Sequence, residues 1–354
     1  MDDFIIIGGG IAGLCAGASL AKHGTVTLLE GEEALGFHAS SRSAAIFIPT
    51  YGAASVTALT VASADALHDT GLTKPRGIMA IGRAGEDEAF AEVAGNLALN
   101  PISVADALLL MPILDGDVIT AAGHREDAWD IDTDALLQLY ARDIRANGQI
   151  VTRAPVTAIR KGDGWEVEAG GTTYRARKII NAAGPWVDAV AEMAGIAPIG
   201  FSALRRSMAR IDVPGDVDAS GWPLVTGAHE NWYSKPDAGA LIVSPAEEDP
   251  CEPMDAWADD MVLAEGLMHF EEHITGEVTR MLANWAGLRT FAPDRQLVIG
   301  EDPTAEGFFW MAGQGGYGFQ TAPAAGWLIA ALASGTAPEF DRQIVEACAP
   351  ARFR

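Results

Sequence analysis

The chain opens on the stretch FIIIGGGIAG, residues 4–13, and this stretch decides the fold. Its apolar run predicts a buried strand, and the glycines after it predict a tight turn into a helix. A second apolar run, VTLL at residues 26–29, ends on the acid Glu30. Strand, glycine turn, helix and strand, with an acid about twenty residues after the first glycine, are typical of a dinucleotide-binding βαβ unit.

Each small residue of the turn has a physical role in such a unit. Gly8 permits the turn that leaves the strand, and Gly10 lacks the Cβ that would keep a pyrophosphate away from the backbone. Gly13 lets the helix pack closely on the sheet, and Glu30 is placed to accept hydrogen bonds from ribose hydroxyls. The alternative, a glycine-rich turn without a ligand, leaves Gly13 and Glu30 unexplained.

The composition indicates two domains and argues against two classes of partner. The 354 residues are too many for one simple core, and 49% of them are hydrophobic, so a sizeable core can be buried. The formal net charge of −24 argues against binding to nucleic acid or to anionic membrane surfaces. An anionic substrate must therefore be attracted by local arginines. Short acidic groups such as residues 86–88 and 247–249 are expected to be solvated faces and loops.

The cysteines and the apolar runs indicate a reducing compartment. Cys15, Cys251 and Cys348 have no regular spacing, so we expect neither a disulfide framework nor a metal site from them. The sequence opens on a core strand rather than a signal peptide, and no apolar run reaches the ~18 residues of a transmembrane helix. A cytoplasmic location is therefore expected.

One pair of histidines has a spacing that can bind metal. His269 and His273 lie four residues apart in residues 257–274, which are predicted to form a long helix. The sequence suggests no third ligand, and Glu271 and Glu272 are typical of a solvated helix face. We therefore expect no metal site.

Capping signals set the limits of a helix in the middle of the chain. Asp132 or Thr133 is a good N-cap, and Gly148 a good C-terminal residue, for a helix over residues 134–147. Asp130 is expected to support the same helix start through the helix dipole.

Three later segments place small or charged residues where a ligand can be held. The buried strand predicted at residues 178–184 ends in Ala-Ala-Gly, which lets the backbone approach a cofactor. The strand predicted at residues 284–291 carries Arg289 among apolar and small residues, and a buried arginine needs an anionic partner. A second glycine-rich turn, residues 313–321, follows the strand predicted at residues 308–312 and leads into a helix predicted from residue 322, so it offers another phosphate or carbonyl contact.

These segments together resemble the FAD-dependent D-amino acid oxidase/dehydrogenase (DAO) family, in order and spacing over nearly the whole chain. Within the family they are most similar to the bacterial D-arginine dehydrogenases. The segments that carry the family resemblance are residues 8–13 with Glu30, 41–43, 181–186, 285–289 and 313–318; details shared with the D-arginine dehydrogenases lie at residues 131–136, 205–207, 233–239 and 306–310.

The resemblance implies a mixed α/β fold in which a Rossmann-like FAD-binding domain is interleaved with an antiparallel-sheet substrate domain, the DAO or glutathione-reductase-2-like fold. The FAD-binding domain would be discontinuous, with residues 1–75, 133–200 and 285–354. The substrate-binding domain would comprise residues 76–132 and 201–284.

The resemblance also implies a non-covalent FAD, since no cysteine lies in a matching segment near the flavin ring. The pyrophosphate would lie on the first glycine turn, and the second glycine turn would face the pyrimidine ring of the flavin. The residues expected to contact FAD are Gly8, Gly10, Ile11, Ala12, Gly13, Glu30, Ser41, Arg42, Ser43, Val156, Ala182, Ala183, Gly184, Trp186, Gly315, Gly316, Tyr317, Gly318, Gln320 and Thr321.

The family resemblance assigns a substrate site as well. Arg289 would clamp the substrate carboxylate, with Arg206, Tyr233, Tyr51 and Gly316 lining the site. The Cα–H would then point at flavin N5, and hydride transfer would give an imino acid that hydrolyses to a keto acid and ammonia. Positioning supplies much of the catalysis, and no side-chain base is needed if the amine binds neutral.

Departures from the D-arginine dehydrogenases indicate a different substrate side chain. Ile46 and Ile48 replace a histidine and a threonine, and the strand with Ile78 lacks the acid that reads a guanidinium. An aliphatic wall disfavours an unpaired cation. We expect a neutral, apolar D-amino acid rather than a basic one.

Several alternatives stay open at this point. The nearest is a sarcosine, glycine or imino-acid oxidase of the same fold, and another class is a non-catalytic flavoprotein subunit, against which Arg206, Tyr233 and Arg289 argue. A 2-hydroxy-acid oxidoreductase normally needs a histidine base, and a flavin monooxygenase a second nucleotide fingerprint; the matching segments offer neither. The electron acceptor would be oxygen or a quinone-type compound, and a dehydrogenase would be peripheral to the membrane.

Overall fold

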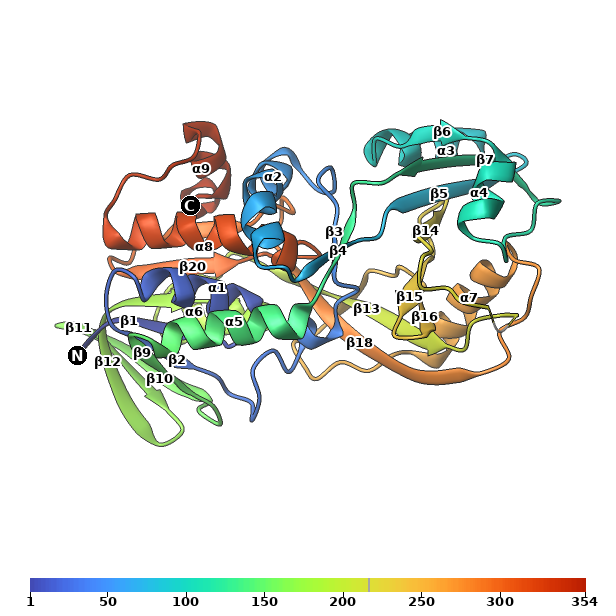
Figure 1. Cartoon of the computed structure of the whole chain (residues 1–354). Coiled ribbons are helices and arrows are strands. Elements are labelled where there is room, and N and C mark those ends of the chain that lie inside the picture. Colours follow the sequence, from blue (N-terminus) through green and yellow to red (C-terminus); the bar gives the residue numbers. More distant parts are fainter. Residues whose placement is uncertain (216) are drawn as a thin grey trace.

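The strands form two large sheets and one small one. The computed structural model describes residues 1–215 and 217–354, and Figure 1 shows the two large sheets in separate halves of the molecule, each with its own helices. Both chain termini lie in the half that is built on the first sheet. The expected mixed α/β fold is confirmed.

The first sheet has eight strands, with a parallel core in the order β9-β2-β1-β12-β20. The hairpin β10–β11 continues it antiparallel to β12, and β19 pairs antiparallel with β20. The strands are β1 (Asp2–Ile7), β2 (Val26–Leu29), β9 (Gly148–Val151), β10 (Val156–Gly162), β11 (Gly164–Ala169), β12 (Thr172–Asn181), β19 (Val298–Glu301) and β20 (Phe308–Ala312).

Strand β1 is buried on both faces, which explains its uninterrupted apolar run. Phe4 and Ile6 pack in the cluster that includes helices α1, α2, α5 and α8, whereas Ile5 and Ile7 pack in the cluster that includes α6. The helices of this half are α1 (Ile11–Leu20), α2 (Ala54–Asp69), α5 (Thr133–Arg145), α6 (Val187–Met193), α8 (Gly318–Ser334) and α9 (Arg342–Cys348), with 3₁₀ turns at Ala39–Arg42, Gly184–Trp186 and Pro350–Phe353.

The second sheet has nine strands in the order β17-β13-β16-β15-β14-β5-β7-β6, with β18 also paired to β13. All its pairs are antiparallel except β14 with β5. Its strands are β5 (Ile78–Arg83), β6 (Asn100–Ile102), β7 (Ile119–Arg125), β13 (Ser202–Ile211), β14 (Leu224–Gly227), β15 (Tyr233–Asp237), β16 (Ala240–Ser244), β17 (Asp249–Cys251) and β18 (Met281–Phe291). The helices α3 (Asp87–Asn96), α4 (Val104–Leu110) and α7 (Asp260–Glu271) pack on it.

Two long strands carry the second sheet toward the first. β13 and β18 pair from Ser202–Phe291 to Ile211–Met281, and Figure 1 shows them extending from the middle of the molecule into the half that is built on the second sheet. The boundary expected at residue 285 therefore falls within β18. Arg206 and Arg289 lie on these two strands, so both are positioned by the same ladder.

The small sheet β3-β8-β4 lies between the halves, where Figure 1 labels β3 and β4. Its strands are β3 (Ile46–Phe47), β4 (Thr73–Pro75) and β8 (Trp129–Ile131). Asp130 has a structural role, as expected, and its partners are distant in sequence: one oxygen accepts from Lys235 Nζ at 2.6 Å and the other from Arg76 Nε at 2.7 Å. Because Lys235 is buried, it needs this partner.

The helix limits follow local signals at some ends and tertiary contacts at others. The N-cap predicted for α5 is confirmed, since Asp132 Oδ1 accepts from the Ala135 N–H at 3.0 Å. The helix predicted over residues 257–274 is shorter, because Asp259 caps it and it ends at Glu271. α8 begins earlier than residue 322, with Gln320 held by Thr60 at 2.9 Å. Within residues 1–215 and 217–354, none of the helices combines the length and apolar character that a bilayer span requires.

The shortened α7 also separates the two histidines. His273 lies beyond the helix end and is buried, with Nδ1 2.7 Å from the His269 carbonyl oxygen and its ring 5.0 Å from that of Trp232. The described part of the chain holds no group of three or more His, Cys, Asp or Glu side chains that could bind a metal ion.

The contact between α1 and β1 gives a stability prediction. A Cβ at Gly13 would lie 1.9 Å from the Gly8 carbonyl oxygen, so Gly13→Ala forces the helix away from the strand. We expect the free energy of unfolding to fall by about 2 kcal/mol or more, measured by denaturant unfolding. Gly95→Ala, at a helical glycine with open space around it, is the control and should be neutral or slightly stabilising. Equal stability of the two variants would contradict the role of Gly13.

Candidate cofactor and substrate site

A cavity of about 800 Å³ runs from the glycine turn of the first sheet to the second sheet. Ile7, Leu29 and Ala182, at the carboxyl ends of β1, β2 and β12, line one end. This edge of a parallel sheet is where ligands bind in open α/β folds. The other end is lined by side chains of β13, β15 and β18, including Arg206, Tyr233 and Arg289.

The first glycine turn is shaped to admit a ligand. Gly8 has φ +109°, and a Cβ there would lie 2.4 Å from the Ala182 carbonyl oxygen, so only glycine fits between β1 and β12. A Cβ on Gly10 would contact just Ser40 Oγ, at 3.2 Å, and otherwise face open space. The backbone at Gly10 is therefore accessible to a pyrophosphate, and the turn fits a dinucleotide.

Glu30 holds the turn in place from the end of β2. Its two carboxylate oxygens accept the N–H of Gly9 at 2.6 Å and the N–H of Glu32 at 2.8 Å. The side chain lines the cavity at the same time.

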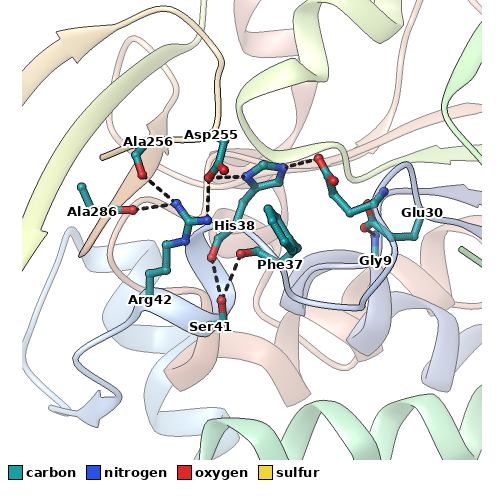
Figure 2. A network of polar contacts seen from close by, with 10 residues as sticks. Gly9, Glu30, Phe37, His38, Ser41, Arg42, Asp255, Ala256 and Ala286 are labelled. Carbon is teal, nitrogen blue, oxygen red and sulfur yellow. Dashed lines mark hydrogen bonds and ion pairs between the residues drawn. The ribbon is translucent and has the colours of Figure 1, made fainter. Parts of the chain in front are cut away.

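The Arg42 side chain contacts the half of the molecule that is built on the second sheet and does not point along the cavity. Its Nη2 lies 2.6 Å from Asp255 Oδ1, and its Nη1 donates to the Ala256 and Ala286 carbonyls at 2.9 Å each (Figure 2). Its guanidinium is thus satisfied within the protein, while its side chain forms part of the cavity wall.

His38 is a cavity residue that sequence reasoning missed. Its Nε2 lies 2.9 Å from Glu32 Oε1, and its ring lies 4.7 Å from that of Trp186. Its Nδ1 is 3.9 Å from Asp255, so His38 and Arg42 both face the same carboxylate of the second half. No local sequence pattern indicates that His38 and Arg42 share Asp255, because Asp255 lies in a loop that is distant in the sequence.

The other predicted cofactor residues fall into two groups. Ile11, Ala12, Ser43, Val156, Ala182, Ala183, Gly184, Trp186, Gly315, Gly316, Gly318 and Gln320 line the cavity with Gly8, Gly10, Glu30 and Arg42. Gly13, Ser41, Tyr317 and Thr321 lie outside the lining. Thr321 Oγ1 donates to the Tyr317 carbonyl at 2.9 Å, and Ser41 Oγ donates to the carbonyls of Phe37 and His38, so both have local structural contacts.

The structure brings all five predicted substrate residues together. A Cβ at Gly316 would lie 3.4 Å from Arg289 Nη1 and 3.9 Å from the Tyr51 ring, so both side chains surround this glycine. The Arg206 guanidinium lies 5.9 Å from the Tyr233 ring centroid. Burial and the neighbouring Arg206 charge lower the pKa of Arg289 below its ordinary value.

Glu248 completes this end of the cavity. Its Oε1 lies 2.6 Å from Arg289 Nη2, 2.9 Å from Arg295 Nη2 and 3.8 Å from Arg206 Nη2. The acids at residues 247–249 are partly exposed, as predicted, but each also has a partner: Glu247 accepts the Ser207 N–H at 2.6 Å, and Asp249 pairs with Arg205 at 3.0 Å. Sequence patterning missed these partners because they lie on other strands.

Part of the cavity wall near Tyr51 and Tyr233 is apolar. Ile46, Ile48 and Ile78 line the cavity, and Ile48 and Ile78 are buried in a cluster with Leu97 and Leu224. Glu230, which sequence reasoning also missed, lines the cavity near this wall. Desolvation and the charge of Glu92 raise its pKa, although Arg206 acts in the opposite direction.

Fold and cavity define a dinucleotide-binding α/β protein with a second, substrate-side sheet. A model of the family described as DAO, FAD dependent oxidoreductase, matches residues 3–332, and the chain belongs to this family. FAD is its cofactor, and the open backbone at Gly10 and the cavity fit that molecule.

Proteins of related structure have several activities. Glycine oxidase from Geobacillus kaustophilus superposes with a TM-score of 0.84 at 19% identity, covering 97% of each chain. L-proline dehydrogenase from P. horikoshii superposes at 0.82 and 20% identity, over 99% of this chain and 97% of that one. N-methyl-L-tryptophan oxidase from Citrobacter koseri is 29% identical over 203 residues, 53% of this chain. That match spans about half the length of the curated relative, 52%.

The contacts of Glu30 give a prediction for cofactor affinity. Glu30→Ala removes the acceptor of two backbone N–H groups at the glycine turn, and hydrogen bonds to a charged group are worth about 1.5–3 kcal/mol. We expect the FAD dissociation constant to rise roughly tenfold or more, measured by flavin fluorescence on dilution. Glu33→Ala, an exposed acid nearby that pairs with Arg153, is the control. If both variants bound FAD like the wild type, Glu30 would not hold the cofactor turn.

Proposed function

We propose that this protein oxidises the amine-bearing Cα of a small amino acid whose side chain is neutral and apolar, with the D configuration preferred. The observation that carries this proposal is the convergence of Arg206 and Arg289 on one end of the cavity that also contains the glycine turn. Two guanidinium groups in a largely buried position are suited to bind a carboxylate.

Each group of the chain has a defined task in this proposal. Arg289 and Arg206 bind the substrate carboxylate, and Tyr51 and Tyr233 lie beside them, so the Cα is held in one orientation. Ile48 and the buried cluster around it receive an apolar side chain and exclude water. FAD, when bound, would accept the hydride from Cα, which carries both electrons, while the nitrogen loses a proton. The imino acid product hydrolyses in water to a keto acid and ammonia.

A second candidate is the oxidation of a secondary or imino amino acid such as sarcosine, proline or an N-methyl amino acid. The observation in its favour is the similarity to N-methyl-L-tryptophan oxidase. Both candidates use the same carboxylate contact and differ in what surrounds the nitrogen. Oxygen or a quinone-type compound would accept the electrons from either substrate.

Anaerobic bleaching of the flavin spectrum distinguishes these candidates. We expect D-leucine, D-methionine and D-phenylalanine to bleach the flavin faster than D-arginine or D-lysine, because the aliphatic cluster around Ile48 offers a cation no partner and burial, which raises the pKa of Glu230, disfavours the charge of that acid. L-amino acids, sarcosine, L-proline and N-methyl-L-tryptophan form the comparison arm. Faster bleaching by D-arginine or D-lysine would exclude the apolar preference, and faster bleaching by the comparison arm would favour the second candidate.

Removal of the clamp gives an independent test. Arg289→Met should raise the dissociation constant for benzoate, a carboxylate without an amine, on the order of 100-fold. The bound FAD should remain, because the arginine lies at the other end of the cavity. Arg280→Met removes an exposed arginine just before the same strand and is the matched control. Unchanged benzoate affinity in Arg289→Met would refute the clamp.

A further inference from the structure

The proposed carboxylate clamp already holds a carboxylate of the protein itself. Arg289 has Nη2 bonded to Glu248 at 2.6 Å, and Arg206 has Nη2 3.8 Å from the same oxygen. These are the groups that the proposed function assigns to the substrate carboxylate. The inference below therefore rests on that proposed function.

A third arginine holds Glu248 from the outer side. Arg295 Nη2 lies 2.9 Å from Glu248 Oε1, and its guanidinium lies 3.9 Å from the centroid of the Phe291 ring. Its side chain is 48% exposed and does not line the cavity, whereas that of Arg289 is 12% exposed and does. Glu248 therefore lies between a guanidinium inside the cavity and one at its rim.

The backbone around Glu248 is anchored on both sides, so its side chain can change partner alone. The Glu247 carbonyl accepts from Arg206 Nε at 3.0 Å, and its carboxylate accepts the Ser207 N–H at 2.6 Å. On the other side, Asp249 pairs with Arg205 at 3.0 Å. A rotation of the Glu248 side chain is enough to leave Arg289.

The charge of Glu248 persists over the working range of pH. Burial acts to raise its pKa, but the hydrogen bond from Arg295 and the charges of Arg289, Arg295 and Arg206 outweigh it, so the pKa lies below the ordinary glutamate value. Glu248 is thus an anion that competes for Arg289 and is a poor proton acceptor.

We propose that Glu248 is a displaceable latch: it occupies the clamp in the substrate-free protein and moves onto Arg295 alone when a substrate carboxylate binds Arg289. A substrate carboxylate that accepts the Nη2 N–H now bonded to Glu248 must displace that oxygen, because one N–H donates one strong hydrogen bond. Arg295 keeps the displaced carboxylate paired, so binding does not leave an isolated negative charge beside the substrate. With this latch, the free energy of substrate binding equals the contact of the substrate carboxylate with Arg289 minus the contact of Glu248 with Arg289 that is lost.

The test measures benzoate binding to the FAD-loaded protein through the change in flavin absorbance. Glu248→Gln removes the competing anion, and we expect its benzoate dissociation constant to fall roughly tenfold. Glu252→Gln, at an exposed acid just after β17 and with the same change of charge, should leave the constant unchanged. An unchanged or weakened affinity in Glu248→Gln would overturn the latch.

Substitution of Arg295 distinguishes the displacement of Glu248 from a general effect of charge on benzoate binding. With Glu248 present, Arg295→Gln should weaken benzoate binding, because Glu248 then has Arg289 as its remaining close partner. In the Glu248→Gln background the same substitution should have little effect. Equal weakening in both backgrounds would show that Arg295 acts only through its field, and it would overturn the latch.

The two proposals can fail separately. If the wild type binds benzoate, Arg289→Met does not and Glu248→Gln equals the wild type, the clamp stands and the latch is wrong. If neither the wild type nor Glu248→Gln binds benzoate, both are wrong. Binding by Glu248→Gln that the wild type lacks would be the strongest support for the latch.

Discussion

The location of the cofactor cavity depends on the close packing of helix α1 against strand β1. The α-carbon of Gly13 lies against the Gly8 carbonyl with no room for a methyl group, and Gly8 in turn lies against the Ala182 carbonyl. These contacts determine where the helix begins and how near β12 approaches. The third contributor, residues 314–320, reaches the same place because β20 pairs with β12. Segments that are far apart in the chain thus meet around one ligand through a few contacts that exclude any Cβ.

At the opposite end of the cavity, a local group of positive charges acts against the net negative charge of the whole chain. The whole chain has a formal net charge of −24, yet Arg206, Arg289 and Arg295 gather around a single carboxylate, that of Glu248. The charges of Arg206 and Arg289 lie in largely buried positions, where solvent screens them less than at the surface. An anionic ligand therefore experiences attraction at both ends of the cavity, from backbone N–H groups at one and guanidinium groups at the other.

The parts of the site that could be predicted are those with a local signature. The glycine turn, Glu30 and the Asp132 cap are each defined by neighbours within a few residues, so spacing alone indicates them. Arg206, Tyr233 and Arg289 were reached through the resemblance of their segments to a family. The contacts that were missed all join distant segments: Arg42 with Asp255, Asp130 with Lys235, and Glu248 with Arg289. A charged residue in an acidic run looks solvated until the fold shows its partner.

The strand order has a consequence for how the protein is made. β1 is made well before one of its two neighbours: β12 lies beyond residue 170, and β20, which borders β12, ends at residue 312. Until β12 is made, the apolar strand β1 has an unfilled hydrogen-bonding edge and is prone to pair with other chains. It is open to such pairing until residue 181 has been made. Since the second glycine turn follows β20, the segments that line the FAD cavity are all present only after residue 320 has been made, and the cofactor can enter a complete cavity only after that point.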